Sequence, residues 1–453
     1  MQSQKIKRPQ RRQAATCKGL QKRVRDLDFD SVEDPRVAGQ TTYPLPTLLT
    51  ALVAAMATMA RSLRMVEQRT EQMAVKQGRW MDVDGRIADN TFGKVLPRLA
   101  FGDLMACLHR LVKSEYRRGN LSPNHLPWGA VAIDGKNVAT LHWHDMVRVL
   151  GLEPGQTDTE AVKTVFAKRF PQAQVNTRDD GTPYALMRVH TVTLISSKAA
   201  CCVHQRPILG HTNELGSLPE LLDELKEAYG RSKLFSVVTT DAGNTSREVA
   251  GKLVEMSLEY FSQLKSPHGE IYAEAVDILG RRRKSRAHTT MTDTQNGKVA
   301  EYHLWRYDLS EQGWLDWTHA RQLVRVQRTT TDKSTGEVKV GNRYYVTSKS
   351  TDALGPSTAL RLCRAHWRCE NNTHWTADAE LKEDRRKLAW SRHPTGNLTV
   401  SALRMMALCI LAVARQLSRL GYTQETPSWG QVSEHFLLEL CGSNLETVAF
   451  DRV

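Results

Sequence analysis

The chain has 453 residues, enough for two or three domains, and its hydrophobic and charged fractions of 40% and 25% are typical of a globular protein. Its net charge of +14 is unusual and favours a polyanionic partner such as DNA or RNA, bound in a salt-sensitive way. The eight cysteines form no CxxC pair, which argues against a zinc ribbon or a disulfide framework. Reduced, mostly buried thiols in a cytoplasmic protein are expected. The amino terminus is basic and lacks the apolar core of a signal peptide, and the most apolar stretch, 45–60, is too short to cross a bilayer.

The first part of the chain divides into an arm and a helical unit. Residues 1–30 are predicted to form a basic mobile arm that contacts backbone phosphates. Residues 31–126 show apolar side chains near the 3.6-residue period, for example Leu45, Leu48 and Leu52, and predict a helical domain. A role for this domain in the fold or in dimerisation is as compatible with the pattern as DNA binding.

From residue 127 the pattern alternates between strands and helices. Strands are predicted over 130–134, 185–196, 198–208 and 235–241, the middle two as a hairpin, with helices over 219–230 and 246–257. Residues 140–184 are interpreted as an insertion. Residues 258–350 are strand-rich, with 281–286 among the strand-like pieces, and helices return from 357.

This order predicts an α/β protein with an RNase H-like (retroviral-integrase-like) core. The core would comprise 127–257 and 351–420, joined to the N-terminal helical domain and interrupted by a β-rich insertion at 258–350. Residues 421–453 are a C-terminal tail with no functional signal.

Three acidic residues stand in suggestive surroundings: Asp134 in AVAIDGK, Asp241 in SVVTTDAGN and Glu370 in RAHWRCENNTHW. The two aspartates are predicted to end buried strands at glycine-bearing turns, and the glutamate to lie in a continuous helix. Taken singly, an Asp-Gly pair is usually a turn and a helical Glu flanked by arginines is usually a surface ion pair. The combination and its order carry the prediction of one shared acidic site.

Clustered carboxylates repel one another unless a cation compensates them. Two Mg²⁺ ions, or Mn²⁺ in their place, would stabilise the attacking and leaving oxygens of a phosphodiester displacement. Asp134 is predicted to bridge the two ions, with Asp241 and Glu370 each binding one.

The chain resembles DDE transposases of bacterial insertion sequences, in the ISAs-type branch of the IS-four superfamily that includes the H-repeat-associated proteins. The motifs that carry this resemblance run in order from about 31 to 415: DPRVAGQTTYPLPTLLTALVAAM, AIDGK, HTNELGSLPELLDEL, VVTTDAGNTSREVA, YYVTSK and RAHWRCENNTHWTADAELKED.

The resemblance implies a catalytic and metal-binding triad of Asp134, Asp241 and Glu370. The wider superfamily places Tyr, Arg and Lys where this chain has Cys363, His366 and Ala377, so phosphate contacts are predicted from other basic side chains. These are Arg364, Arg368 and Lys382 near the glutamate, and Arg281, Arg282, Arg283, Lys284 and Arg286 in the insertion.

Two further residues are predicted to support the acids from behind, His366 and Asp378, the latter about two helical turns beyond Glu370. A solvated face is the favoured interpretation of Glu383 and Asp384. The His374-Trp375 pair either packs the helix on the sheet or meets a flipped base, and packing is favoured.

The predicted function is DNA transposition: cleavage at the terminal inverted repeats and joining to target DNA, by a homodimer assembled on DNA in a bacterial, nucleoid-associated setting. Two rivals remain open, an RNase H-like nuclease without strand transfer and a decayed or domesticated copy that only binds DNA.

Overall fold

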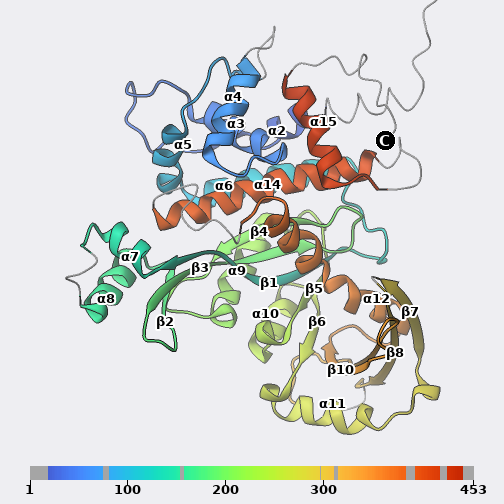
Figure 1. Cartoon of the computed structure of the whole chain (residues 1–453). Helices are drawn as coiled ribbons and strands as arrows, with labels where there is room; N and C mark the ends of the chain where they lie inside the picture. Colours follow the sequence, from blue (N-terminus) through green and yellow to red (C-terminus); the bar gives the residue numbers. More distant parts are fainter. Residues whose placement is uncertain are drawn as a thin grey trace, which may run out of the picture.

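The structure of the chain is a computed structural model that describes residues 19–74, 81–153, 158–295, 297–310, 315–383, 393–418 and 426–441. Most of the predicted basic arm (1–18) and most of the predicted tail therefore lie outside the described residues. Within the described parts, α2 lies inside the predicted arm and α15 inside the predicted tail (Figure 1).

The amino-terminal part is helical, as predicted. Its helices are α2 (Gly19–Arg25), α3 (Leu45–Ala57), α4 (Leu63–Ala74), α5 (Asp89–Val95) and α6 (Phe101–Arg117), with 3-10 turns η1 (Phe29–Ser31) and η2 (Leu96–Arg98). Helix α3 is buried along nearly its whole length because it lies at the centre of this bundle, whereas α6 buries one stripe that includes Leu104, Leu108 and Leu111.

Among the described residues, one mixed sheet of ten strands forms the rest of the scaffold. The strands are β1 (Ala130–His142), β2 (Ala173–Thr177), β3 (Pro183–Leu194), β4 (Cys201–Pro207), β5 (Val237–Thr240), β6 (Glu259–Leu264), β7 (Thr289–Gln295), β8 (Lys298–Asp308), β9 (Gln322–Asp332) and β10 (Val338–Thr347). Their order is β2-β3-β1-β5-β6-β10-β9-β8-β7, and β4 pairs with β3 beside β2.

Strands β1, β5 and β6 are parallel, and the other pairings are antiparallel. A helical crossover joins β5 to β6, whereas the connection from β1 to β5 also contains β2, β3 and β4. Strand β5 is buried along its whole length, as expected for a strand covered on both faces.

Most of the remaining helices cover or flank this sheet. They are α7 (Trp143–Leu150), α8 (Thr159–Arg169), α9 (Glu214–Tyr229), α10 (Arg247–Glu255), α11 (Glu270–Gly280), α12 (Pro356–His366), α13 (Trp375–Ala379) and α14 (Pro394–Ser418), with 3-10 turns η3 (Ala242–Asn244), η4 (Ser266–His268) and η5 (Lys284–Arg286). Helix α15 (Trp429–Cys441) instead packs against α14 and α4.

Helix α14 joins the two halves of the protein. It packs against α3 and α6 on one side and against β4 on the other, so the blue N-terminal helices and the green strands lie on opposite sides of it in Figure 1. Among the described residues it is the one helix long and apolar enough to cross a membrane. Its apolar window is wholly buried inside the protein, as in the core helix of a globular fold.

The predicted strands and helices of the core are confirmed, and β3 and β4 pair as the expected hairpin. Three local predictions are wrong. Strand β1 does not end at Asp134 but continues to His142, because Gly135 takes part in strand pairing rather than in a turn. The 281–286 segment is a bend with a 3-10 turn, and the preceding helix α11 lies in a region predicted to be strand-rich.

Candidate active site

The two aspartates lie side by side at one place in the sheet. Strands β1 and β5 are parallel, and their register pairs Ile133 with Thr240. Asp134 and Asp241 each follow directly, so the sheet places them on neighbouring strands at the same level. This is the edge where ligands commonly bind in open α/β sheets, beyond the carboxyl end of a strand such as β5.

Asp241 is held by the turn that it begins. Its carboxylate accepts hydrogen bonds from the backbone N–H and the side-chain amide of Asn244, both at 3.0 Å. Its carbonyl oxygen accepts a hydrogen bond from the Thr245 hydroxyl at 2.6 Å. These contacts fix the orientation of the carboxylate before any ligand binds.

Glu370 does not lie in the continuous helix that was predicted. It belongs to a π-helical segment, Cys369–His374, inserted between α12 and α13, in which the Trp375 N–H bonds to the Glu370 carbonyl. This wider turn brings both Cys369 and His374 against Asp134, with Cys369 Sγ and His374 Nδ1 at 3.8 and 3.6 Å from Asp134 Oδ2. Single π turns of this kind are frequent at functional sites.

The electrostatics show that the three acids influence one another. The pKa of Asp134 is raised to about 7, first by burial and then by the negative charges of Asp241, Glu370 and Glu214. The pKa of Glu370 is also raised, mainly by burial, with Arg343 opposing and Asp241 adding to the shift. Negative charge at this site is therefore only partly compensated by the protein.

The donor chemistry fits a hard divalent cation. The converging groups are carboxylates, the ligands that Mg²⁺ prefers, and a cation would relieve the repulsion that raises the pKa of Asp134. Within the described ranges, no three His, Cys, Asp or Glu side chains are gathered closely enough to hold a metal ion alone. Mg²⁺ tolerates this, because it keeps several waters and takes further oxygens from a phosphate substrate.

Behind the acids runs a buried ladder of charges. Lys136, two residues beyond Asp134 on the same face of β1, lies 2.7 Å from Asp378 Oδ1 and 3.6 Å from Glu383 Oε2. Arg404 on α14 contacts the other Glu383 oxygen at 3.1 Å. Glu383 is fully buried, so the solvated face favoured for it is wrong. These ion pairs link β1 to α13 and α14. Asp384, for which a solvated face was also favoured, lies outside the described residues.

His366 fastens α12 to the sheet beside Asp241. Its Nδ1 lies 2.8 Å from the Thr239 hydroxyl, which donates to the Val131 carbonyl at 3.2 Å. Burial lowers the pKa of His366 to about 4, against a smaller opposing effect of Asp241, so the ring is neutral at physiological pH. The His374-Trp375 pair divides: His374 is buried and bonds the Thr191 hydroxyl, whereas Trp375 is 56% exposed.

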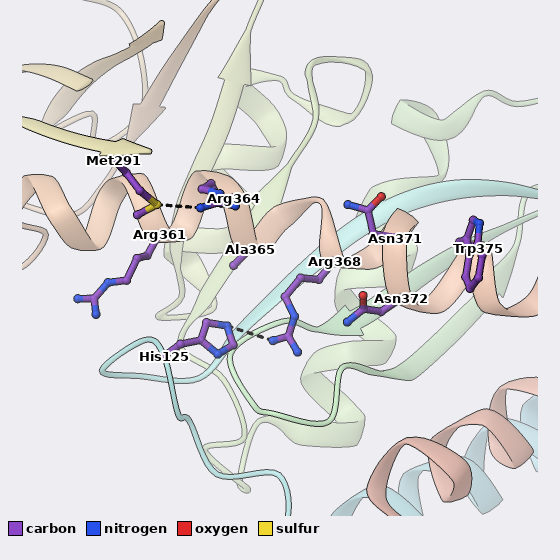
Figure 2. Close-up of a pocket in the computed structure, with 9 residues that line it drawn as sticks. All are labelled: His125, Met291, Arg361, Arg364, Ala365, Arg368, Asn371, Asn372 and Trp375. Atoms are coloured by element: carbon purple, nitrogen blue, oxygen red, sulfur yellow. Dashed lines mark hydrogen bonds between the residues drawn. The ribbon is translucent and has the colours of Figure 1, made fainter. Parts of the chain in front are cut away.

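Beside Glu370 a basic cavity of about 890 Å³ opens along α12 and the π segment (Figure 2). It is lined by His125, Met291, Arg361, Arg364, Ala365, Arg368, Asn371, Asn372 and Trp375. Three arginines, two amides and an exposed indole are the combination expected of a groove for a nucleic-acid strand.

The arginines of this cavity differ in their availability. Arg368 donates to the carbonyl oxygens of Ile195, Ser197 and Lys198, so its guanidinium anchors the segment to the β3–β4 connection and has little left for a phosphate. Arg364 forms an ion pair with Asp293. Arg361, which the sequence analysis did not select, is exposed.

Of the other basic side chains predicted to contact phosphates, some already interact within the protein and some are exposed. Arg281 lies 3.4 Å from Asp277, Arg282 lies over the Tyr307 ring, and Lys284 donates to the Thr329 hydroxyl. Arg283 and Arg286 are exposed on the same bend, between α11 and β7. Lys382 is half-buried, in a left-handed backbone conformation just before Glu383.

One acid was missed by the sequence analysis. Glu214, the first residue of α9, contributes to the raised pKa of Asp134 and lies 3.4 Å from the Asn244 amide that also holds Asp241. It stands in HTNELGSLPELLDEL, one of the motifs that carry the family resemblance, but no role was predicted for its glutamate. The available signal was an acidic residue inside a family motif, just ahead of the helix predicted over 219–230.

A comparison with known protein families shows which family the chain belongs to. Residues 131–406 match the family described as Transposase DDE domain, a stretch that covers more than half of the chain and includes all three predicted acids. This chain belongs to the DDE transposase family.

Two Escherichia coli (strain K12) relatives support the predicted branch of this transposase family. The protein YbfL is 24% identical over 232 residues, and the H repeat-associated protein YhhI is 23% identical over 232 residues. Each alignment covers 49% of this transposase chain and 58% of the relative, so the chain spans a little over half the length of these relatives. The predicted resemblance to H-repeat-associated transposases is confirmed.

A solved structure with a looser likeness is the piggyBac transposase synaptic complex with hairpin DNA. It is 12% identical, with a TM-score of 0.40, and the match covers 98% of this chain and 82% of that one.

Proposed function

We propose that this protein is an insertion-sequence transposase that cleaves the ends of its element and joins them to target DNA by divalent-metal-dependent phosphoryl transfer. The observation that supports the proposal is that Asp134 on β1, Asp241 at the end of β5 and Glu370 in a π turn lie near enough to interact: besides burial, which is the largest cause, the charges of Asp241 and Glu370 raise the pKa of Asp134.

The strand order supports an RNase H-like assignment of the core. Strands β4-β3-β1-β5-β6 form a five-stranded unit with β1, β5 and β6 parallel and β3 and β4 antiparallel to their neighbours. The unit places the first acid on its first strand and the second at the end of the adjacent strand. In this proposal β6 belongs to the core, because it pairs in parallel with β5, although it falls inside the insertion predicted at 258–350. Strands β7–β10 then form the β-rich insertion between the second and third acids and extend the same sheet.

Asp134, Asp241 and Glu370 would hold Mg²⁺, or Mn²⁺ in its place. When bound, the cations would stabilise the charge of an in-line phosphoryl displacement and make a hydroxyl nucleophilic without a protein base.

The protein's own residues orient the acids and the DNA. Asn244 fixes the Asp241 carboxylate, and the side chains of His374 and Cys369 contact Asp134.

The cavity beside Glu370 would bind the DNA strand, with Arg361 and Arg364 near its phosphates and Trp375 available to stack on a base. The net charge of +14 would add non-specific, salt-sensitive attraction. Two ends must be processed together, so we propose a homodimer on nucleoid DNA in the bacterial cytoplasm.

The test is nicking of DNA that carries the element's terminal repeat, with Mg²⁺ or Mn²⁺. Asp134→Ala, Asp241→Ala and Glu370→Ala should each abolish nicking while the affinity for the same DNA is retained. Equal cleavage by the wild type and all three variants would exclude this acidic site as the site of catalysis.

A second assay separates the remaining alternatives. Joining of a pre-cut terminal repeat to target DNA is expected of a transposase, whereas a plain nuclease would nick but not join. A copy that has kept only DNA binding would bind the repeat and do neither.

A further inference from the structure

The amino-terminal end of α9 is fastened to the sheet directly beside Asp134. His190 on β3 lies opposite Gly135 of β1 and is fully buried. Its Nε2 lies 2.9 Å from the carbonyl oxygen of Glu214 and 2.7 Å from the Ser217 hydroxyl. Because a carbonyl can only accept, the Nε2 carries the proton, and the neutral imidazole fixes where the first turn of α9 sits.

The carboxylate of Glu214 rests against the backbone of Gly135. A Cβ added to Gly135 would lie only 2.3 Å from the Glu214 Cδ and Oε1 atoms. Gly135 is within a regular strand and has no left-handed backbone angle, so its missing side chain allows the close approach of Glu214 and does not serve a turn. Any larger residue after Asp134 would push the Glu214 carboxylate away from its present position.

The same carboxylate is linked to Asp241. The Asn244 amide nitrogen lies 3.0 Å from Asp241 Oδ1 and 3.4 Å from Glu214 Oε2. Its amide oxygen is buried and has no hydrogen-bond partner among the described residues. The amide nitrogen, by contrast, faces both carboxylates and holds Glu214 and Asp241 close together.

An ion pair alone does not account for this arrangement. Arg188 lies 3.0 Å from Glu214 Oε1, but it also bonds Gln174, and it leaves Glu214 Oε2 turned toward Asn244. A glutamate that served only the helix N-terminus or the ion pair with Arg188 would not need to lie against Gly135. It would also not need to share the Asn244 amide with Asp241.

We propose that Glu214 is a fourth carboxylate of the active site, which contributes to binding the divalent cation together with Asp134, Asp241 and Glu370. Asn244 orients Glu214 and Asp241 toward the same cation. This inference rests on the proposed metal-dependent function and names a further residue of that site.

The direct test is Mn²⁺ binding to the full chain without DNA, measured from the electron paramagnetic resonance signal of free Mn²⁺. Glu214→Gln keeps the shape of the side chain and removes its charge, and should weaken Mn²⁺ binding about 10-fold or more. Gly135→Ala should do the same, because the new Cβ displaces the flexible end of Glu214. Glu220→Gln is the matched control, because this exposed acid of α9 pairs with Arg206 and should bind Mn²⁺ like the wild type.

Thermal unfolding would confirm that both variants fold, and nicking of terminal-repeat DNA would be followed in parallel. Equal Mn²⁺ binding by Glu214→Gln and the wild type would overturn the inference, while wild-type nicking would leave the proposed function intact. If the wild-type chain itself nicks no terminal-repeat DNA, the proposed function is contradicted, and weaker Mn²⁺ binding by Glu214→Gln would still support the inference.

Discussion

The two faces of the segment from Pro356 to Ala379, which carries Glu370, have opposite characters. The sheet side, consisting of His366, Cys369, Thr373 and His374, is buried and holds the acidic site together. The groove side, consisting of Arg361, Arg364, Asn371 and Trp375, lines the basic cavity (Figure 2). The contrast separates two tasks along one stretch of chain: substitutions behind the acids should act on stability and catalysis, and substitutions in the groove should act on DNA affinity.

The largest effect on stability is expected at the charge ladder behind the sheet side. Lys136→Met would remove the buried cation shared by Asp378 and Glu383, leaving Glu383 with Arg404 alone, and should lower the free energy of unfolding by about 3 kcal/mol. Chemical denaturation measures this. The control Lys163→Met removes a more exposed pair with Glu160 and should cost less than about 1 kcal/mol. Equal losses in both variants would show that the ladder is not a structural element.

The next largest effect on stability is expected at Arg368, which lines the groove but donates its hydrogen bonds to backbone carbonyls inside the protein. Arg368→Lys keeps the charge but loses the fork that reaches the Ile195, Ser197 and Lys198 carbonyls, and should lower stability by about 2 kcal/mol. Arg361→Lys, on an exposed side chain of the same face, should leave stability unchanged. If Arg368→Lys had the free energy of unfolding of the wild type and a reduced DNA affinity, Arg368 would be assigned to DNA binding and not to stability.

On the groove side, Trp375 should contribute through stacking. Trp375→Ala should weaken binding of single-stranded DNA by about 1–3 kcal/mol, because the indole is more than half exposed in the cavity. Fluorescence anisotropy with a labelled oligonucleotide measures this, and the melting temperature should remain that of the wild type. Unchanged affinity would assign the cavity to a different strand or partner.

The smallest effect is expected for a single phosphate contact. Arg361→Gln should reduce the salt dependence of DNA binding by about one unit of the log–log slope. Lys226→Gln, an exposed cation on α9, is the matched change of charge and should leave the slope unaltered. Equal slopes for all three proteins would place Arg361 outside the DNA path.

The comparison also shows why some features were predictable. The strands around Asp134 and Asp241 could be predicted because short apolar runs have a clear pattern, and the three acids because their motifs occur in a fixed order. The π turn at Glu370 could not be predicted, since local propensity does not distinguish it from an α-helix and it is stabilised by contacts of Cys369 and His374 with the sheet.

Charge on a side chain, likewise, did not reveal its use. Arg364 and Arg368 have the same local surroundings in sequence, yet one pairs with Asp293 and the other with backbone carbonyls about 170 residues away. Gly135 was predicted to be a turn residue because it follows an aspartate. In the structure it lies within a strand, and the Glu214 carboxylate of α9 occupies the space where a side chain would begin.

By itself the sequence predicted the class of protein, the order of most of its elements and three acids in family motifs, because each depends on patterns within short stretches of chain. The tertiary structure decided which side chains lie around these acids. Parallel pairing of β1 with β5 sets Asp134 beside Asp241, and the docking of α9, α13 and α14 brings Glu214 to Asn244 and Lys136 to Asp378 and Glu383, residues far apart in sequence. Carboxylates and cations interact through distance and burial, and both are properties of the folded chain.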